Sequence, residues 1–223
     1  MAVDLIQTSG GGGNMFKMVF DGEKALETLL YIANRCPIKD IYHIIKIQFF
    51  ADRKHLERNG RFITGDSYIA MKNGPVASNA YNFLKAARGE SIYLPPKMIE
   101  AIRAALEVKE FSVKTKRSEN SDYLSQSDIA CLDEAIAENG NLSFAELNSK
   151  SHDRLWQEAN RNDEICFDAF IEHSQNSEQL KSYSEVFNFD LERMERHLKA
   201  EAVTLPNNIT TASDIKKWLS ANG

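Results

Sequence analysis

The sequence lacks several features that define large classes of protein. No run of apolar residues approaches the roughly 18 that a transmembrane helix needs, so we expect no membrane partner. The N-terminus has no charged stretch followed by an apolar one, so we expect no secretory signal. The 3 cysteines, Cys36, Cys131 and Cys166, are too few and too scattered for a disulfide framework or a CxxC metal site. Together these absences predict a cytoplasmic protein with reduced thiols.

Proline and glycine are also scarce, at 5 and 11 of 223 residues, which excludes collagen-like and low-complexity chains. Four of the glycines are consecutive, at positions 10–13. Such a run has great backbone freedom and no side chains to bury, so residues 1–20 are expected to form a flexible tail. The run is not a phosphate-binding loop, because no Gly-Lys-Ser/Thr sequence follows it.

Charge is distributed unevenly along the chain, whose net charge is −5. Residues 1–118 contain 18 Lys and Arg against 12 Asp and Glu, whereas residues 119–172 contain 3 against 13. Two interpretations are open: the acidic segment attracts a basic protein partner, or it packs beside the basic first half of the same chain. The excess of acid disfavours binding to nucleic acid, although one local cluster is basic: Lys109, Lys114, Lys116 and Arg117.

Apolar residues recur every three or four positions over most of the chain from Asp21 onward, which predicts helices. Asp21 is the expected N-cap of the first helix, and Pro75 is the expected first residue of the third. Ser/Thr-x-x-acid sequences predict three further starts, at Ser125, Ser143 and Thr211. The expected helices cover residues 21–36, 38–58, 75–88, 96–106 and 125–139, a short segment from 143, and residues 153–160, 163–175, 184–200 and 212–221.

A segment of different character lies between the second and third helices. Its sequence, FITGDSYIAMKNGPV at positions 62–76, alternates and contains two turn signals, Gly65-Asp66 and Asn73-Gly74, so it predicts a β-hairpin. Residues 111–116 alternate in the same way and predict a short strand. The chain is therefore expected to be mainly α, a compact multi-helix domain with a small β-hairpin or short sheet.

The polar residues do not form a recognisable metal-binding or catalytic pattern. His43 and His55 share one helix, but their spacing puts them about 18 Å apart at 1.5 Å per residue, so they cannot bind one ion. Lys46 and Asp52, on the same helix, are expected to contact the loops of the hairpin rather than each other. His152-Asp153 suggests a catalytic pair, but the chain has no GxSxG or similar nucleophile motif.

The simpler interpretation of the segment around His152 is a helix cap followed by a core aromatic, Trp156. Cys131 and Cys166 are expected on apolar helix faces, where a cysteine acts as a small hydrophobic residue. We therefore expect no enzyme activity, no catalytic residues, no metal and no cofactor.

Two blocks of residues follow a recognisable order and spacing. The first block contains Lys46, Ala51-Asp52, Gly60-Arg61, ITGD at 63–66, Tyr68, Ala70-Met71 and Gly74-Pro75-Val76. The second block contains Leu124, Ser127-Asp128, LDE at 132–134, Gly140, Glu146-Leu147, Ser151-His152 and Trp156. Over residues 22–172, about two thirds of the chain, the pattern resembles the Panacea domain, the family of SocA-like antitoxins and phage-associated proteins.

The resemblance implies a Panacea-like domain over residues 21–176, followed by a C-terminal helical extension over 177–223. It implies an antitoxin of a toxin–antitoxin system, which neutralises a cognate toxin by direct protein–protein binding. In a variant of this role, the antitoxin delivers the toxin to a ClpXP-type protease. The motif residues would build the scaffold and the partner surface: Lys46, Asp52, Arg61, Gly65, Asp66, Gly74, Pro75, Val76, His152 and Trp156.

The charge pattern suggests where a basic toxin would approach. Asp133, Glu134 and Glu138 are expected to lie exposed on one helix and to steer such a partner. The alternative is that the interface lies on the hairpin side, near Asp66 and Asn73. A second function also stays open: a helical fold with a hairpin suits a winged-helix DNA-binding regulator, which the basic cluster at 109–117 favours and the acidic segment does not.

Overall fold

The computed structural model describes residues 18–182 of the chain. The glycine run and the helices expected at 184–200 and 212–221, with the start at Thr211, lie outside the described residues. The boundary expected between 176 and 177 stays a prediction. The helices are α1 (Gly22–Arg35), α2 (Ile41–Asn59), α3 (Ser78–Arg88), α4 (Pro96–Ala105), the 3-10 helix η1 (Ser121–Tyr123), α5 (Gln126–Asn139), α6 (Phe144–Ser151), α7 (Arg154–Glu158) and α8 (Phe167–Glu172).

The strands are short and antiparallel, and they form two small sheets. They are β1 (Tyr68–Met71), β2 (Gly74–Ala77), β3 (Leu106–Lys109), β4 (Ser112–Thr115) and β5 (Glu164–Ile165). The expectation of a mainly helical fold with a small sheet is confirmed. In residues 18–182 no helix is both long enough and apolar enough to cross a bilayer.

Local capping chemistry explains where several helices begin. Asp21 accepts a 3.0 Å hydrogen bond from the amide of Lys24 and begins α1, as predicted. Asp40 accepts from the amide of His43 at 2.8 Å, so α2 begins at Ile41 and not at residue 38. Two further helices begin with the capping boxes that the sequence predicts: Ser125 with Asp128 before α5, and Ser143 with Glu146 before α6.

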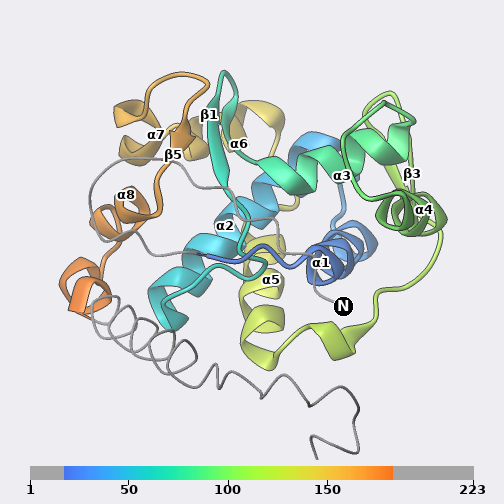
Figure 1. Cartoon of the computed structure of the whole chain (residues 1–223). Coiled ribbons are helices and arrows are strands. Elements are labelled where there is room, and N and C mark those ends of the chain that lie inside the picture. The colour runs from blue at the N-terminus through green and yellow to red at the C-terminus, as the bar shows by residue number, and fades with distance from the viewer. Residues whose placement is uncertain (1–17, 183–223) are drawn as a thin grey trace, which may run out of the picture. The chain divides into compact units, whose positions relative to one another are not determined.

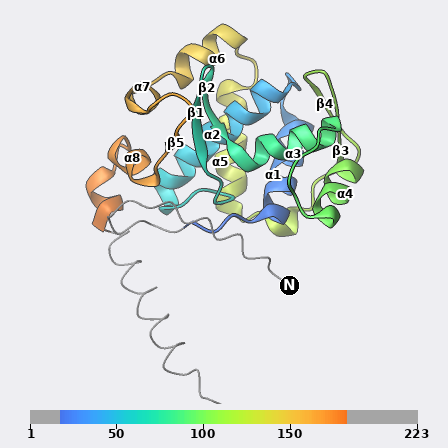
Figure 2. The same ribbon diagram turned by 45° about the horizontal axis from the view of Figure 1, so that its top comes forward.

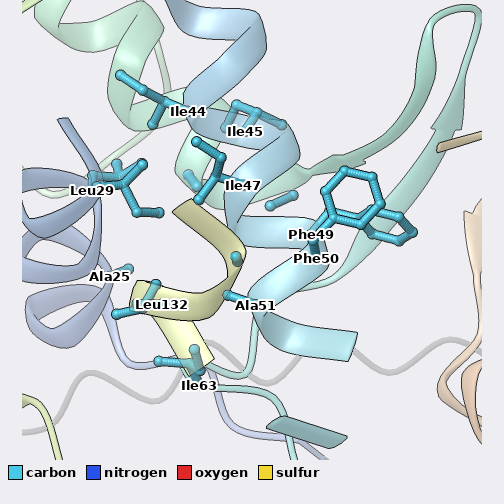
Figure 3. Close-up of a cluster of buried hydrophobic side chains, with 14 of the residues drawn as sticks. Ala25, Leu29, Ile44, Ile45, Ile47, Phe49, Phe50, Ala51, Ile63 and Leu132 are labelled. Atoms are coloured by element: carbon cyan, nitrogen blue, oxygen red, sulfur yellow. The ribbon is translucent and has the colours of Figure 1, made fainter. Parts of the chain in front are cut away.

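Helix α2 is the centre of the hydrophobic core, and α1 and α5 pack against it (Figure 1). Its Ile44, Ile47 and Phe49 are completely buried. Leu29 of α1 and Leu132 of α5 contribute to the same cluster of side chains (Figure 3). Burial of one such side chain stabilises a fold by about 1.5–3 kcal/mol. The cluster therefore holds the three helices together and fixes the direction of α2.

The β1–β2 hairpin lies where the sequence predicts it, but its second strand is longer than expected. β1 pairs with β2 on one side and with β5 on the other. Pro75 pairs with Ala70 inside β2, and α3 begins only at Ser78, so the prediction that Pro75 opens a helix is wrong. Proline is tolerated here because β2 is an edge strand, where a missing N–H need not break a ladder bond. Gly65-Asp66 precedes β1 and is not a turn of the hairpin.

Two other boundaries differ from the sequence prediction. Leu106 begins β3 instead of ending the fourth helix, and Val108 pairs with Val113 across the β3–β4 hairpin. Residues 163–175, expected as one helix, divide into β5 and α8 because Ile165 pairs with Tyr68 of β1. In a short apolar run, periodicity cannot distinguish a helix from a strand, because the strand that would pair with the run is distant in sequence.

The β1–β2 hairpin lies beside α6 and α7 (Figure 2). The first sequence block supplies α2 and the hairpin, and the second supplies α5, α6 and α7. The fold therefore brings residues of both blocks, such as Lys46 and Trp156, to one hairpin.

Candidate functional site

The side chain of Lys46 supports the outer edge of the hairpin. It is inaccessible to solvent, and its Nζ donates a 2.7 Å hydrogen bond to the backbone carbonyl of Pro75. Gly74, at φ +92°, leaves space for this amine: a Cβ there would lie 2.7 Å from Lys46 Nζ and 2.4 Å from Ser151 Oγ. Burial lowers the pKa of Lys46 to about 7, because the ammonium loses its hydration.

Asp52 joins α2 to the segment that precedes β1. Its carboxylate is fully buried and accepts hydrogen bonds from the Ile63 amide at 2.7 Å and the Tyr68 hydroxyl at 2.6 Å. Burial raises the pKa of Asp52 to about 7, although both hydrogen bonds favour the ionised form. Lys46 and Asp52 thus each contact the hairpin region, as predicted.

Asp66 caps a helix that is not its immediate neighbour. α3 follows Ala77, whose methyl group cannot accept a hydrogen bond. The carboxylate of Asp66 instead accepts from the backbone amides of Asn79 at 3.0 Å and Ala80 at 2.9 Å. Burial raises the pKa of Asp66 to about 6, against the effect of these bonds. Asp66 therefore fixes the start of α3 to the base of the hairpin.

Gly65 and Arg61 hold the loop between α2 and β1. Gly65 has a φ of +69°, and a Cβ there would lie 2.3 Å from the carbonyl oxygen of Val19. Arg61 donates a 3.1 Å hydrogen bond to the carbonyl of Phe62 and lies 3.4 Å from the carboxylate of Asp128 in α5. These contacts attach the loop to the start of the described chain and to α5.

His152 and Trp156 hold the turn of the hairpin from the side of α6 and α7. Trp156 Nε1 donates to the carbonyl of Met71 at 2.8 Å, and His152 Nε2 lies 3.1 Å from the carbonyl of Lys72. The two rings pack edge to face, with centroids 3.8 Å apart. Trp156 is half-buried and packs against the hydrophobic core, so it is a core aromatic only in part; its N–H binds a backbone carbonyl of the hairpin. Asp153 caps α7, as predicted.

A groove lies between the hairpin, the first turns of α2 and the start of α6. We call it the hairpin groove, lined among others by Tyr42, Ile45, Met71, Val76, Phe111 and Phe144. Its volume is about 530 Å³, within the range of about 300–1,000 Å³ that ligand pockets occupy. Eight of its twelve lining residues are apolar or aromatic. Phe111 is 69% exposed, Phe144 51% and Met71 37%.

Positive charge surrounds the hairpin groove. Lys46 lies at its floor, and the exposed Lys72 lies at its rim in the hairpin turn. The amine of Lys85 lies 4.8 Å from the ring centroid of Tyr81, another lining residue. The single acid among the lining residues, Asp40, is occupied as the cap of α2 and as the partner of the His43 ring at 2.9 Å. The groove is therefore an apolar surface with excess positive charge.

The three acids expected to steer a toxin have partners within the chain. Asp133 accepts a 2.6 Å hydrogen bond from the hydroxyl of Tyr31. Glu134 binds both guanidinium nitrogens of Arg58 at 2.7 Å. Glu138 accepts from Lys54 Nζ at 2.7 Å. The acidic segment thus packs beside the basic first half of the chain, which was one of the two interpretations of the charge pattern.

The basic cluster expected at 109–117 is also largely occupied by internal contacts. Lys109 pairs with Glu107 at 3.0 Å within β3. Lys116 Nζ donates to the carbonyl of Arg103 at 2.7 Å. Arg117 binds the carboxylate of Glu27 in α1 through two nitrogens, and these contacts hold the β3–β4 hairpin to the helices.

The cysteines differ from one another in their surroundings. Cys131 is buried on α5, as predicted, but Cys166 is exposed and precedes α8, so its assignment to an apolar helix face is wrong. The strand β5 displaces it from the helix that the sequence predicts. Among residues 18–182, no three His, Cys, Asp or Glu side chains are arranged to hold a metal ion.

The aromatic residues of the hairpin groove are missed by reasoning from the sequence. Phe144 is the first residue of α6, directly after the N-cap Ser143. Its place at a helix start is the one feature of the sequence that points to an exposed side chain. Phe111 lies in the β3–β4 turn next to Glu110, which has a φ of +55°. Nothing local predicts that Tyr42, Phe111 and Phe144 line one surface, because they come from three separate segments.

Comparison with known proteins gives one match. The family model for the antitoxin SocA-like Panacea domain matches residues 44–157, which include α2, both hairpins and the helices α5 to α7 in most of their length. No curated protein and no solved structure matches the chain. The matched segment contains all ten motif residues described above, from Lys46 to Trp156.

Proposed function

The chain belongs to the SocA-like antitoxin family with a Panacea domain, and from this membership we propose that it neutralises a cognate toxin by binding to it directly. The observation that supports binding over catalysis is the position of the motif residues. Lys46, Asp52 and Asp66 are buried, and they are hydrogen-bonded to the backbone of the hairpin, of the loop before β1 and of α3, respectively. Groups held in this way stabilise a surface and are not free to react with a substrate.

The proposal has a direct test in cells. The gene next to this one is expressed alone and together with this protein, and growth is scored. We expect the neighbour to stop growth alone, and co-expression to restore growth. The two proteins should also co-purify, since a stable interface buries on the order of 1,200–2,000 Å². Restored growth without any complex would contradict direct neutralisation.

A protease-adaptor role is a variant of the same proposal and is distinguished by the host. The co-expression test is repeated in a strain without the ClpXP-type protease. Direct neutralisation predicts that growth is restored in both strains and that the toxin accumulates in complex. An adaptor predicts that rescue is lost in the mutant strain while the complex still forms.

A DNA-binding regulator is the second candidate function, and it depends on the basic cluster of the β3–β4 hairpin. The carboxylates of Glu107 and Glu27 pair with Lys109 and Arg117 and leave that cluster less net charge to offer phosphates. Binding of the purified protein to the duplex upstream of its own gene, measured against salt concentration, tests this alternative.

A further inference from the structure

We propose that the hairpin groove is the toxin-binding site and that it takes a segment of the toxin in which an aromatic or branched aliphatic side chain lies next to a carboxylate. The inference rests on the proposed function and specifies its surface and the chemistry of its partner.

The apolar character of the groove supports the aromatic or aliphatic anchor. Six large apolar side chains are exposed among residues 18–182, and three of them, Met71, Phe111 and Phe144, line this groove. They come from β1, the β3–β4 turn and α6, so only the folded protein gathers them. Large aromatic side chains that fill or frame a pocket supply most of the binding energy at protein interfaces. A hollow with this lining gives an apolar anchor a site that excludes water.

The charges of the groove support the neighbouring carboxylate. Nζ of Lys46 donates one hydrogen bond, to the Pro75 carbonyl, lies 5.3 Å from the centroid of the Tyr42 ring, and has at least one further N–H to offer. Burial lowers the pKa of Lys46 to about 7, and a carboxylate bound beside it would favour the charged form. No carboxylate of the described chain pairs with Lys46 or with Lys72, whereas the acid at the rim, Asp40, already contacts His43. A carboxylate brought into the groove would interact with these cations in surroundings of low polarity, where charge attraction is stronger than in water.

A protein segment suits the groove better than nucleic acid does. Nucleic-acid sites present rows of exposed Lys and Arg to the phosphates. Here eight of twelve lining residues are apolar or aromatic, and Lys46 is buried. The acids of α5 are a poorer candidate for the same role, because Glu134 and Glu138 are already paired with Arg58 and Lys54.

The test measures binding of the purified full-length protein to the purified product of the adjacent gene. Two variants alter the groove: Phe111→Ser removes an exposed apolar side chain, and Lys72→Glu reverses the rim charge. Two matched controls make the same changes outside the groove, at the fully exposed Tyr93 (Tyr93→Ser) and at Lys97 of α4 (Lys97→Glu). Lys72→Arg is a conservative rescue variant. The four residues changed in these five variants are exposed, and circular dichroism verifies folding.

We expect Phe111→Ser and Lys72→Glu to weaken binding at least tenfold, Phe111→Ser through faster dissociation and Lys72→Glu through slower association as well. Both controls and Lys72→Arg should remain within twofold of wild type. If wild type binds but the groove variants bind equally well, the groove assignment is wrong and direct neutralisation stands. The groove assignment is also wrong if only Asp133→Lys, Glu134→Lys and Glu138→Lys slow association with the toxin. It is wrong as well if the groove variants lose affinity for a DNA duplex and not for the toxin. If wild type restores growth but does not bind at all, both the groove and the proposed function fail.

Discussion

At the scale of single residues, Gly74 and Gly89 have nearly the same backbone conformation in different surroundings. Their φ angles are +92° and +95°, which L side chains adopt only with strain. A Cβ at Gly74 would meet Ser151 and Lys46, whereas a Cβ at Gly89 would meet no atom within 4 Å. We expect Gly89→Ala to reduce the free energy of unfolding by about 1 kcal/mol, and Gly74→Ala to cost roughly 1–3 kcal/mol more through overpacking. Urea denaturation of the two variants measures these changes. If both variants lose the same free energy of unfolding, the space beside Lys46 is not needed.

Lys46 gives a second prediction at this scale, on pH. Its pKa is lowered to about 7 in the folded protein, so between pH 7 and its ordinary pKa near 10.5 the unfolded chain binds more protons than the folded one. The free energy of unfolding therefore rises with pH between about 7 and 10.5, and below pH 7 the cost of burying the charged amine is present in full. Between pH 7 and pH 9, the free energy of unfolding of wild type should rise by about 2 kcal/mol relative to that of Lys46→Met.

Urea denaturation at the two pH values measures this difference, and the exposed Lys72→Met serves as the control. The control variant should follow the pH dependence of wild type, because the ammonium of Lys72 lies at the surface. A constant difference between wild type and Lys46→Met across this range would contradict a burial-shifted lysine.

At the scale of elements, the start of α3 depends on a residue in another part of the chain. Asp66 accepts from the amides of Asn79 and Ala80, both within the first turn of α3. Asp66→Ala would leave both amides without their acceptor, and the amide of Ala80 is buried, so the free energy of unfolding should fall by roughly 2–3 kcal/mol. Asp66→Asn keeps one acceptor oxygen and should cost less.

The matched control for this prediction is Asp21→Ala, which removes a local and exposed cap from α1. An exposed amide finds water when its cap is lost, so the cost there should be about 1 kcal/mol. Thermal unfolding followed by circular dichroism compares the three variants. A loss at Asp66→Ala no larger than at Asp21→Ala would show that the distant cap adds nothing to ordinary helix capping.

At the scale of the whole molecule, opposite charges from the two halves of the sequence meet. Asp128 of α5 is completely buried and lies 2.6 Å from Lys24 Nζ of α1 and 3.1 Å from His55 Nε2 of α2. Burial alone would raise the pKa of this carboxyl, but hydrogen bonds from His55 and Lys24 hold it well below its usual range. This carboxylate therefore joins three helices, whereas the pair of Arg58 and Glu134 lies at the surface.

Removing one partner of a buried ion pair leaves the other charge unpaired, so Asp128→Asn should reduce stability by roughly 3–5 kcal/mol at pH 7. Glu134→Gln should cause little measurable change, because exposed pairs contribute little. The contribution of Asp128 is present above pH 4 and is lost as pH falls through its depressed pKa. The difference in the free energy of unfolding between wild type and Asp128→Asn should therefore become smaller as pH falls from 4 to 2. Urea denaturation at both pH values measures this difference. A difference that does not change with pH would contradict the role of Asp128 as a stabilising carboxylate.

The sequence by itself determined those features that depend on neighbours along the chain. Asp21, Ser125 and Ser143 start helices because each accepts a hydrogen bond from an amide three residues later. The hairpin at 68–77 follows from alternation and from the turn signal at Asn73-Gly74, although the connecting residues are Lys72 and Asn73, and Gly74, with a positive φ, begins β2 opposite Met71. The order of the two residue blocks was sufficient to indicate the family.

Only the tertiary structure decided what depends on contacts between distant residues. Pro75 is strand and not helix because β1 pairs with it, and the indole of Trp156 is held against the hairpin turn because it donates to the carbonyl of Met71. The acids of α5 are paired and not free because α2 brings Arg58 and Lys54 to them. The hairpin groove likewise exists only where α2, two hairpins and α6 converge. Such contacts join residues that are tens of positions apart, and no local pattern of hydrophobicity or charge encodes which of them meet.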